Sequence, residues 1–405
     1  MKVKVLNRFL ALSLLGLLII SCEKEDLDPL QPIAVVNTFE DIYDIDYTLT
    51  SYETRIPFPE VDYTYRVFHP WHPPLEAVIF DYNGDGYLDV IDHRSDYGNN
   101  TTNKILFLKG TPEGTLIKDT ANSDKIEGLV HGRKGLTGDF NGDGLPDAFF
   151  MGHGYDGGNF PGEYPILLLN SPSGKFTVQR FQSTIGFFHG GASGDIDNDG
   201  DLDIIIISGT SPQNSTVFEN QGNGQFQLTS IQSHSWFSSS NIVSNLGGKF
   251  TMELYDLNQD SYLDIVLAGH DNSQWDTNGA IYFGSSTGFS SNPIYLPKDS
   301  TFGITTDIDF FDLDQDGAKE IILQKTTHEP FYQEFSVRVI DGVTFQDTSE
   351  LYFTNNQNDG GPYSGWIYWL SIYQDTTGAV VLRGDDMRSN HKWILNSQTG
   401  FFVKQ

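Results

Sequence analysis

The sequence predicts an all-β fold, a β-propeller of six, or alternatively seven, four-stranded blades. Three observations support this prediction: an acidic nine-residue pattern recurs five times, short β-branched and aromatic runs flank each copy, and Gly, Asn and Asp separate those runs. Short strands at even spacing with turn residues between them are typical of all-β repeat folds. Four strands per repeat make the sheet of one propeller blade.

The acidic loops set the length of the repeat. They occupy residues 81–89, 139–147, 195–203, 256–264 and 312–320, so that successive loops begin 58, 56, 61 and 56 residues apart. A sixth unit begins near residues 373–378, where the acidic pattern has decayed but strand-like runs persist. We therefore expect residues 76–405 to form the propeller.

The flanking runs predict the strands of each unit. The second unit has them at 135–138, 148–151, 166–169 and 176–181, and the third at 191–194, 204–207, 216–219 and 225–231. The last unit supplies strands at 379–382, 392–395 and 401–404. Residues 36–75 either close the ring as an outer strand or form a degenerate seventh blade, and six blades are favoured.

The N-terminus has the features of a signal peptide over residues 1–21. Lys2, Lys4 and Arg8 precede an apolar run at 9–20, which is too short to cross a bilayer as a helix. The run ends in Ile-Ile-Ser before Cys22, which resembles the lipobox of bacterial lipoproteins. That resemblance implies cleavage before Cys22 and its lipidation; the alternative is a buried free thiol after an ordinary cleavage site.

Residues 22–35 form an acidic tether behind this cysteine. Its first part, residues 23–28, resembles the surface-export tag of lipoproteins in Bacteroidetes-type bacteria. The resemblance implies a lipoprotein of the bacterial outer membrane, exposed at the cell surface, that contacts the membrane through its lipid anchor alone.

The overall charge narrows the choice of partners. The chain has 54 Asp+Glu against 24 Lys+Arg, a formal net charge of -30. Such a protein is repelled by phosphate backbones and anionic membrane surfaces, so we expect no nucleic-acid partner. A single cysteine also excludes an internal disulfide framework.

Each acidic loop has the ligand pattern of a shortened EF-hand calcium loop between the first and second strands of a blade. Oxygen side chains stand at positions 1, 3 and 5, a turn residue at 6, a backbone carbonyl at 7 and a carboxylate at 9. This flexible oxygen cage suits Ca²⁺ better than Mg²⁺, which requires strict octahedral geometry. The alternative is an Asx-rich turn without metal, but five copies in register favour about five structural calcium sites.

Two loops depart from the pattern, since Ser261 replaces the turn glycine and Glu320 replaces the ninth-position Asp. The predicted calcium ligands are Asp81, Asn83, Asp85, Tyr87, Asp89, Asp139, Asn141, Asp143, Leu145, Asp147, Asp195, Asp197, Asp199, Asp201, Asp203, Asp256, Asn258, Asp260, Tyr262, Asp264, Asp312, Asp314, Asp316, Ala318 and Glu320.

These five loops make the chain resemble the FG-GAP/VCBS-repeat propellers, the type that includes the integrin α head. The resemblance covers residues 76–405. It implies adhesion or lectin-like roles and does not choose between them, because one fold hosts many functions.

The propeller face opposite the calcium loops is rich in groups that recognise ligands. The loops entering the first strand and leaving the second strand of each blade share this face, and most of the ten histidines map to it. Aromatic rings stack on sugars, and Arg and His hydrogen-bond to hydroxyls. The predicted ligand-binding residues are Trp71, His72, His93, His131, Arg133, His153, Tyr155, His189, His270, Trp275, Trp366 and Arg383.

Three functions remain open at this point. The favoured one is binding of an extracellular ligand, most of all a carbohydrate. The second is catalysis, because some similar calcium-loop propellers are polysaccharide lyases; His131, His153, His270, Arg133 and Arg383 would then supply a base and a cation for β-elimination. The third is recognition of a surface protein. A three-histidine zinc site lacks supporting spacing, and no Ser-His-Asp or Cys-His signature is present.

Overall fold

The computed structural model describes residues 77–87, 89–93, 100–112, 116–238, 240–271, 278–328, 333–354, 369–374, 377–385 and 390–405. The signal peptide, Cys22, the tether and residues 36–75 lie outside these ranges, as do Trp71, His72, Trp275 and Trp366. The backbone of Arg383 is described, but its side chain is not.

The described residues form six antiparallel sheets, which confirms the six-bladed propeller. Blade 1 consists of β1 Ala77–Phe80, β2 Asp89–Asp92, β3 Leu106–Gly110 and β4 Leu116–Lys118. Blade 2 consists of β5 Gly132–Gly138, β6 Asp147–Gly152, β7 Ile166–Leu169 and β8 Thr177–Arg180. Blade 3 consists of β9 Phe188–Gly194, β10 Asp203–Ser208, β11 Thr216–Asn220 and β12 Phe226–Ser230.

Blade 4 consists of β13 Lys249–Tyr255, β14 Asp264–Gly269, β15 Ala280–Tyr282 and β16 Ile294–Tyr295. Blade 5 consists of β17 Ile304–Phe311, β18 Glu320–Thr326 and β19 Phe335–Ile340. Blade 6 consists of β20 Trp369–Gln374, β21 Val380–Asp385, β22 Asn390–Leu395 and β23 Phe402–Lys404. Strands expected from the sequence are present with ends that differ by at most three residues.

The fifth blade departs from the expected four strands. Its sheet has three strands within the described residues. After β19 the chain makes a single bridge between Ile340 and Asp347 and then turns into the 3-10 helix η5 at Ser349–Leu351. Asp341 accepts the amides of Val343 and Thr344 in the turn before this bridge. η5 then takes the place of the pairing that a fourth strand would continue.

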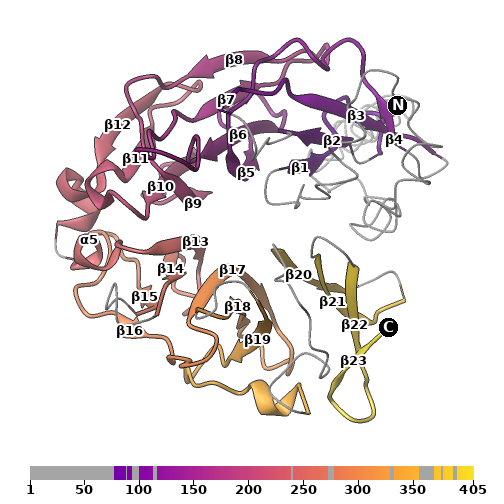
Figure 1. The fold of residues 1–405 in the computed structure, drawn as a ribbon, viewed down its shortest axis with the longest axis vertical. Coiled ribbons are helices and arrows are strands. Elements are labelled where there is room, and N and C mark those ends of the chain that lie inside the picture. The colour runs from indigo at the N-terminus through magenta and orange to yellow at the C-terminus, as the bar shows by residue number, and fades with distance from the viewer. Residues whose placement is uncertain are drawn as a thin grey trace, which may run out of the picture.

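The sheets surround a common centre, and the first strand of each blade lies nearest to it (Figure 1). Neighbouring first strands are in contact from β1 through β5, β9, β13 and β17 to β20. Short helical segments, the longest of them α5 at Ile242–Asn245, connect blades 3 and 4. Among the described residues, no helix is long and apolar enough to span a membrane.

The second strands of blades 1 to 5 are buried on both faces, which explains apolar runs such as residues 204–207 in β10. Alternate side chains of a strand point to opposite faces. Ile204 and Ile206 of β10 pack toward blade 2, and Ile205 and Ile207 pack toward blade 4. Apolar clusters of this kind fill each of the five interfaces between consecutive blades in the described part of the chain.

Polar pairs also join the first strands around the centre. Lys134 of β5 forms an ion pair with Glu253 of β13 and so links blades 2 and 4 past blade 3. Asp307 and Asp309 of β17 accept backbone amides of β20, from Leu370 at 2.8 Å and from Ile372 at 2.9 Å. The centre of the ring is therefore cross-linked by buried ionisable side chains as well as by sheet packing.

Candidate metal loops and the opposite face

The five acidic loops share one backbone geometry. In the third loop, both oxygens of the Asp195 carboxylate accept backbone amides, Oδ1 from Asp199 and Oδ2 from Gly200, each at 3.0 Å. The first aspartate of every other loop accepts the amide of the sixth residue in the same way, at 2.7–3.2 Å. This network curls the loop so that its side chains at positions 1, 3 and 5 can converge.

The fourth and sixth residues of each loop adopt the left-handed conformation that favours glycine. The sequence prediction identified only the sixth. In the third loop these residues are Asn198, with φ +61, and Gly200, with φ +98. Ser261 holds φ +73 in the fourth loop, so it reproduces the turn without glycine.

The ninth residue ties the loop to the rest of its blade. Asp203 is 1% exposed, and its two oxygens accept the amide of Ile196 at 3.1 Å and the amide of Asn220, at the end of β11, at 2.8 Å. Asp89, Asp147 and Asp264 make equivalent bonds in their blades. Glu320 is buried too, and its longer side chain still accepts the amide of Leu313, at 2.5 Å.

Asparagines then link one loop to the next, a feature that sequence reasoning missed. The side-chain amide of Asn220 donates to the carbonyl of Phe140 in the preceding loop at 3.0 Å, and that of Asn170 donates to the carbonyl of Tyr82 at 2.9 Å. Asn220 is the last residue of the third strand β11 and Asn170 directly follows the third strand β7, and each is followed by Gly within four residues. That repeated pattern is the signal that would have identified them.

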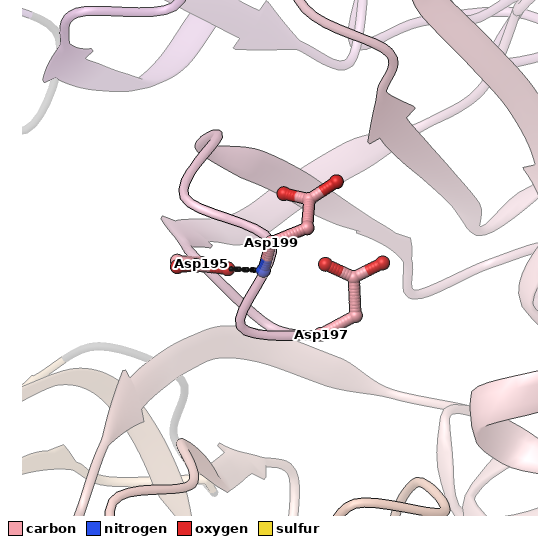
Figure 2. Close-up of side chains that lie close together, drawn as sticks. All are labelled: Asp195, Asp197 and Asp199. Atoms are coloured by element: carbon pink, nitrogen blue, oxygen red, sulfur yellow. Dashed lines mark hydrogen bonds between the residues drawn. The ribbon is translucent and has the colours of Figure 1, made fainter.

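Acidic side chains gather at two of the loops. Asp195, Asp197 and Asp199 bring one oxygen each to within 4.8 Å of one another, and so do Asp312, Asp314 and Asp316. Figure 2 shows the carboxylates of Asp197 and Asp199 close together, and the Asp195 carboxylate accepting a hydrogen bond from the backbone amide of Asp199. A further group joins Asp314 and Glu320 to Asp341, which lies outside the predicted ligand set. These three groups have the donor chemistry for a divalent cation.

Burial changes the acidity of the ninth carboxylates. It raises the pKa of Asp89, Asp147 and Asp203 to about 7 and that of Asp264 to about 6, against the lowering effect of the amides that they accept. All the predicted loop ligands lie in described residues at the turn between first and second strands. The fit of the loops to a cation thus rests on their oxygen donors and on the shared curl of the backbone.

At the opposite end of the blades, the structure brings four of the predicted histidines into one row with His328 and aromatic partners. Ring centroids of His131 and His153 lie 5.0 Å apart, and those of His153 and His189 lie 4.9 Å apart. Phe250 then bridges His189 to His270, at 4.8 Å from each. His328, 5.8 Å from His270, extends the row to blade 5. We call these rings, together with Phe187, the ring row.

The ring row contains both buried and half-buried rings. His131, His153 and His270 are buried, whereas His189, Phe250 and His328 are half-buried. Burial, reinforced by Arg133, holds the pKa of His153 and of His189 well below the usual range, and burial lowers that of His270 to about 4. Neutral imidazole both donates and accepts hydrogen bonds.

Other predicted ligand-face residues have different positions. His93 is fully buried, and its Nε2 accepts the amide of Leu129 at 2.5 Å, so it connects blade 1 to the chain entering blade 2. Tyr155 is half-buried in the loop after β6. Glu163 accepts the amides of Val130, His131 and Gly154, which holds the start of the ring row in place.

Phe160 is a residue of this face that sequence reasoning did not identify. Its side chain is 51% exposed, its φ of +49 is unusual for a residue other than glycine, and its ring contacts Phe187 at 5.5 Å. Phe187 in turn stacks on His153 at 4.4 Å. Strained, exposed aromatic residues gather at binding sites more often than elsewhere. The backbone conformation that marks Phe160 has no sequence signature.

Comparison with known proteins supports the repeat. Residues 139–206 and 195–251 match the FG-GAP-like repeat, which confirms the expected resemblance for the second and third acidic loops. The chain is thus a β-propeller that contains FG-GAP-like repeats. No curated protein matches it.

Solved structures resemble the chain in fold. A rhamnogalacturonan lyase of Bacillus licheniformis has a TM-score of 0.40 at 12% identity, over 82% of this chain and 63% of that one. The rhamnogalacturonan lyase YesW has a TM-score of 0.40 at 13% identity, over 82% and 64%. The Dos1 propeller has a TM-score of 0.41 at 10% identity, over 78% and 66%. The chain spans less than two thirds of the length of each.

Proposed function

We propose that this protein is a calcium-stabilised propeller that binds an extracellular carbohydrate on the face opposite the acidic loops. The single observation that carries the proposal is the ring row, which runs across blades 2 to 5 and includes the half-buried rings of His189, Phe250 and His328. The accompanying Phe160 offers a half-exposed apolar face.

The chemistry of these rings suits a sugar. The apolar faces of pyranose rings stack on aromatic side chains, and their hydroxyls need donors and acceptors in a fixed arrangement. The half-buried His189 ring is neutral, and neutral imidazole can donate or accept hydrogen bonds. The Arg133 guanidinium lies near enough to His189 to interact electrostatically. The surface thus combines stacking groups with hydrogen-bonding groups, as small-molecule sites do.

The acidic loops would hold Ca²⁺ as structural staples. The ligands would be the predicted residues at positions 1, 3, 5, 7 and 9, with Asp341 as an added donor in the fifth loop. Bound cations would supply positive charge between carboxylates that otherwise repel one another. The loops that would bind these cations lie at the opposite end of the blades from the ring row, which favours a role of the cations in stability.

The N-terminal sequence supports a lipid anchor at Cys22 and a location on the outer surface of the outer membrane. Cys22→Ala should release the protein from the membrane fraction, and protease added to intact cells should degrade the unmodified protein. Retention of the variant in membranes would contradict the anchor, and full protection would contradict surface exposure.

A glycan array tests the binding proposal, with the unmodified chain and Phe160→Ala compared in the presence of Ca²⁺. We expect signals on a defined group of glycans that weaken in the variant. A blank array together with capture of a surface protein would favour the adhesion function instead.

One observation favours a second function, that of a polysaccharide lyase. A neutral imidazole beside a guanidinium, as in His189 and Arg133, has the pairing of base and cation that β-elimination at a uronate needs. Incubation with acidic polysaccharides tests it, because the reaction produces unsaturated uronates that absorb in the ultraviolet. Absence of new absorbance would leave binding without catalysis.

A further inference from the structure

A buried charged cluster lies where blades 4 and 5 meet, at the same end of the blades as the ring row. Lys249 begins β13, Asp271 follows β14, and Lys325 lies in β18. The amide of Asp271 donates to the carbonyl of Gly303 at 2.7 Å, and that of His270 donates to the carbonyl of Gly248 at 2.9 Å. These bonds fix the cluster between the two blades.

Only one of the two lysines in the cluster is paired with the carboxylate. Lys325 is 1% exposed, and its Nζ donates to Oδ2 of Asp271 at 2.5 Å and to Oγ1 of Thr305 at 3.3 Å. Lys249 is 0% exposed, and its Nζ has no hydrogen-bond partner among the described residues. Within the described part of the chain, two ammonium groups therefore share one carboxylate, which leaves one excess positive charge in the cluster.

The remaining titratable groups around Lys249 do not balance this charge. Lys298 and Lys325 act on it with the same sign, and Asp271 is the one carboxylate among the described residues that acts on it. His270 is neutral at pH 7, because burial lowers its pKa to about 4. Burial also lowers the pKa of Lys249, to about 8, a value that keeps most of its ammonium charged at neutral pH.

An unpaired buried ammonium is expensive. Removing its charge from water is unfavourable, and a counter-charge offsets that penalty best when it also accepts a hydrogen bond from the ammonium group. An apolar residue such as methionine would fill the same volume without this penalty. The position is therefore explained best by an anion that pairs with Lys249.

We propose that Lys249 and Lys325 form a carboxylate-recognition site, so that the carbohydrate bound by this face is an acidic sugar. Phe250, the next residue of β13, belongs to the ring row and contacts both His189 and His270. A sugar stacked on the row thus lies next to the chain position from which Lys249 projects. This inference rests on the proposed function, which it narrows to uronate-bearing ligands.

Calorimetric titration of the full chain in Ca²⁺ at constant ionic strength tests the inference, with glucuronate and glucose as probes that differ only in the C6 carboxylate. We expect glucuronate to bind at least tenfold more tightly. Lys249→Met should abolish the difference and leave glucose binding unchanged, whereas Lys249→Arg should retain it. Lys298→Met, which removes an exposed lysine nearby, is the matched control and should also retain it.

A second arm separates this inference from the proposed function. Sodium acetate should raise the unfolding temperature above that in sodium chloride of equal concentration, by about 2 °C, and Lys249→Met should lose that increment. Equal stabilisation of both proteins by acetate overturns the carboxylate site whatever the sugars do. Binding of neutral glycans without any preference for glucuronate overturns the carboxylate site but leaves the carbohydrate-binding function standing. If no sugar binds and the acetate effect is intact, the carbohydrate-binding function is overturned.

Discussion

The backbone amide of Ser261 donates a 2.8 Å hydrogen bond to Oδ2 of Asp256, and Ser261 takes a φ of +73 in order to do so. Glycine makes the same bond with a similar φ in the other four loops. The loop geometry is therefore imposed by its hydrogen bonds and its strand ends, and the fourth loop holds it at a cost in backbone strain.

Ser261→Gly should stabilise the protein. A left-handed residue other than glycine costs about 1–2 kcal/mol, which exceeds the extra chain entropy of glycine, about 0.4–1 kcal/mol. We expect a net gain of roughly 0.5–1 kcal/mol in the free energy of unfolding by urea, measured in Ca²⁺. Ser261→Ala keeps the β-carbon and is the control without a gain; equal stabilities of the two variants would show that the turn is unstrained.

Removal of calcium should lower the unfolding temperature. For a dissociation constant near 10⁻⁴ M, 1 mM Ca²⁺ contributes about 1.4 kcal/mol per site by mass action. Differential scanning calorimetry in 1 mM Ca²⁺ and in excess EGTA measures the difference in unfolding temperature. Re-addition of Ca²⁺ should restore the higher unfolding temperature, and Mg²⁺ should restore it only weakly. An unfolding temperature that does not respond to EGTA would contradict the calcium assignment.

Phe160 should affect ligand binding and stability in separable ways. Phe160→Ala and Phe160→Gly both lose the ring, so both should weaken glycan binding up to about tenfold, the range of one aromatic stacking contact. The glycine variant should be the more stable of the two, because φ is +49 at this position.

The matched control for this experiment is Tyr295→Ala. Tyr295 is also 51% exposed but lies on β16 at the outer edge of blade 4. Its loss should leave binding unchanged. If the two alanine variants weaken binding equally, the effect is not specific to the ring-row face.

Asp307 should make the stability of the protein fall as pH rises. Burial raises its pKa from 3.8 to about 8; the amide of Leu370 and the Lys134 charge act against this shift, and the carboxylates of Glu253 and Asp309 add to it. Between about pH 4 and 8 the folded state therefore holds a proton that the unfolded state has released, and stability declines across that window. Asp307→Asn should flatten the decline.

Urea unfolding at pH 5 and pH 8 compares the unmodified protein with this variant. We expect Asp307→Asn to gain stability relative to the unmodified protein at pH 8 and to gain less at pH 5. Parallel pH profiles would mean that Asp307 keeps an ordinary acidity in the folded protein.

Much of the fold follows from local sequence patterns. The loops at 195–203 and 256–264 contain their own ligand spacing and turn residues, and apolar runs such as 204–207 identify strands buried on both faces. Strand alternation also indicated which loops share a face, and the rings of His153, His189 and His270 do lie in one row.

The features that the sequence did not indicate depend on distant contacts. The ion pair between Lys134 and Glu253 joins residues 119 positions apart, and ring closure alone places them together. Likewise Lys249 looks like an ordinary strand-edge lysine until Asp271 and Lys325 are seen beside it. Phe160 is identified by its exposure and backbone angle, neither of which is encoded in a local pattern.

Hydrogen–deuterium exchange, with and without a saturating glycan selected from the array, tests the central claim most directly. The claim is that the ligand lies on the ring-row face. We expect new protection at residues 153–163, 186–190 and 248–250 and unchanged exchange in the acidic loops at 81–89 and 195–203. Protection confined to the acidic loops or to the outer strands β8, β12 and β16 would contradict it.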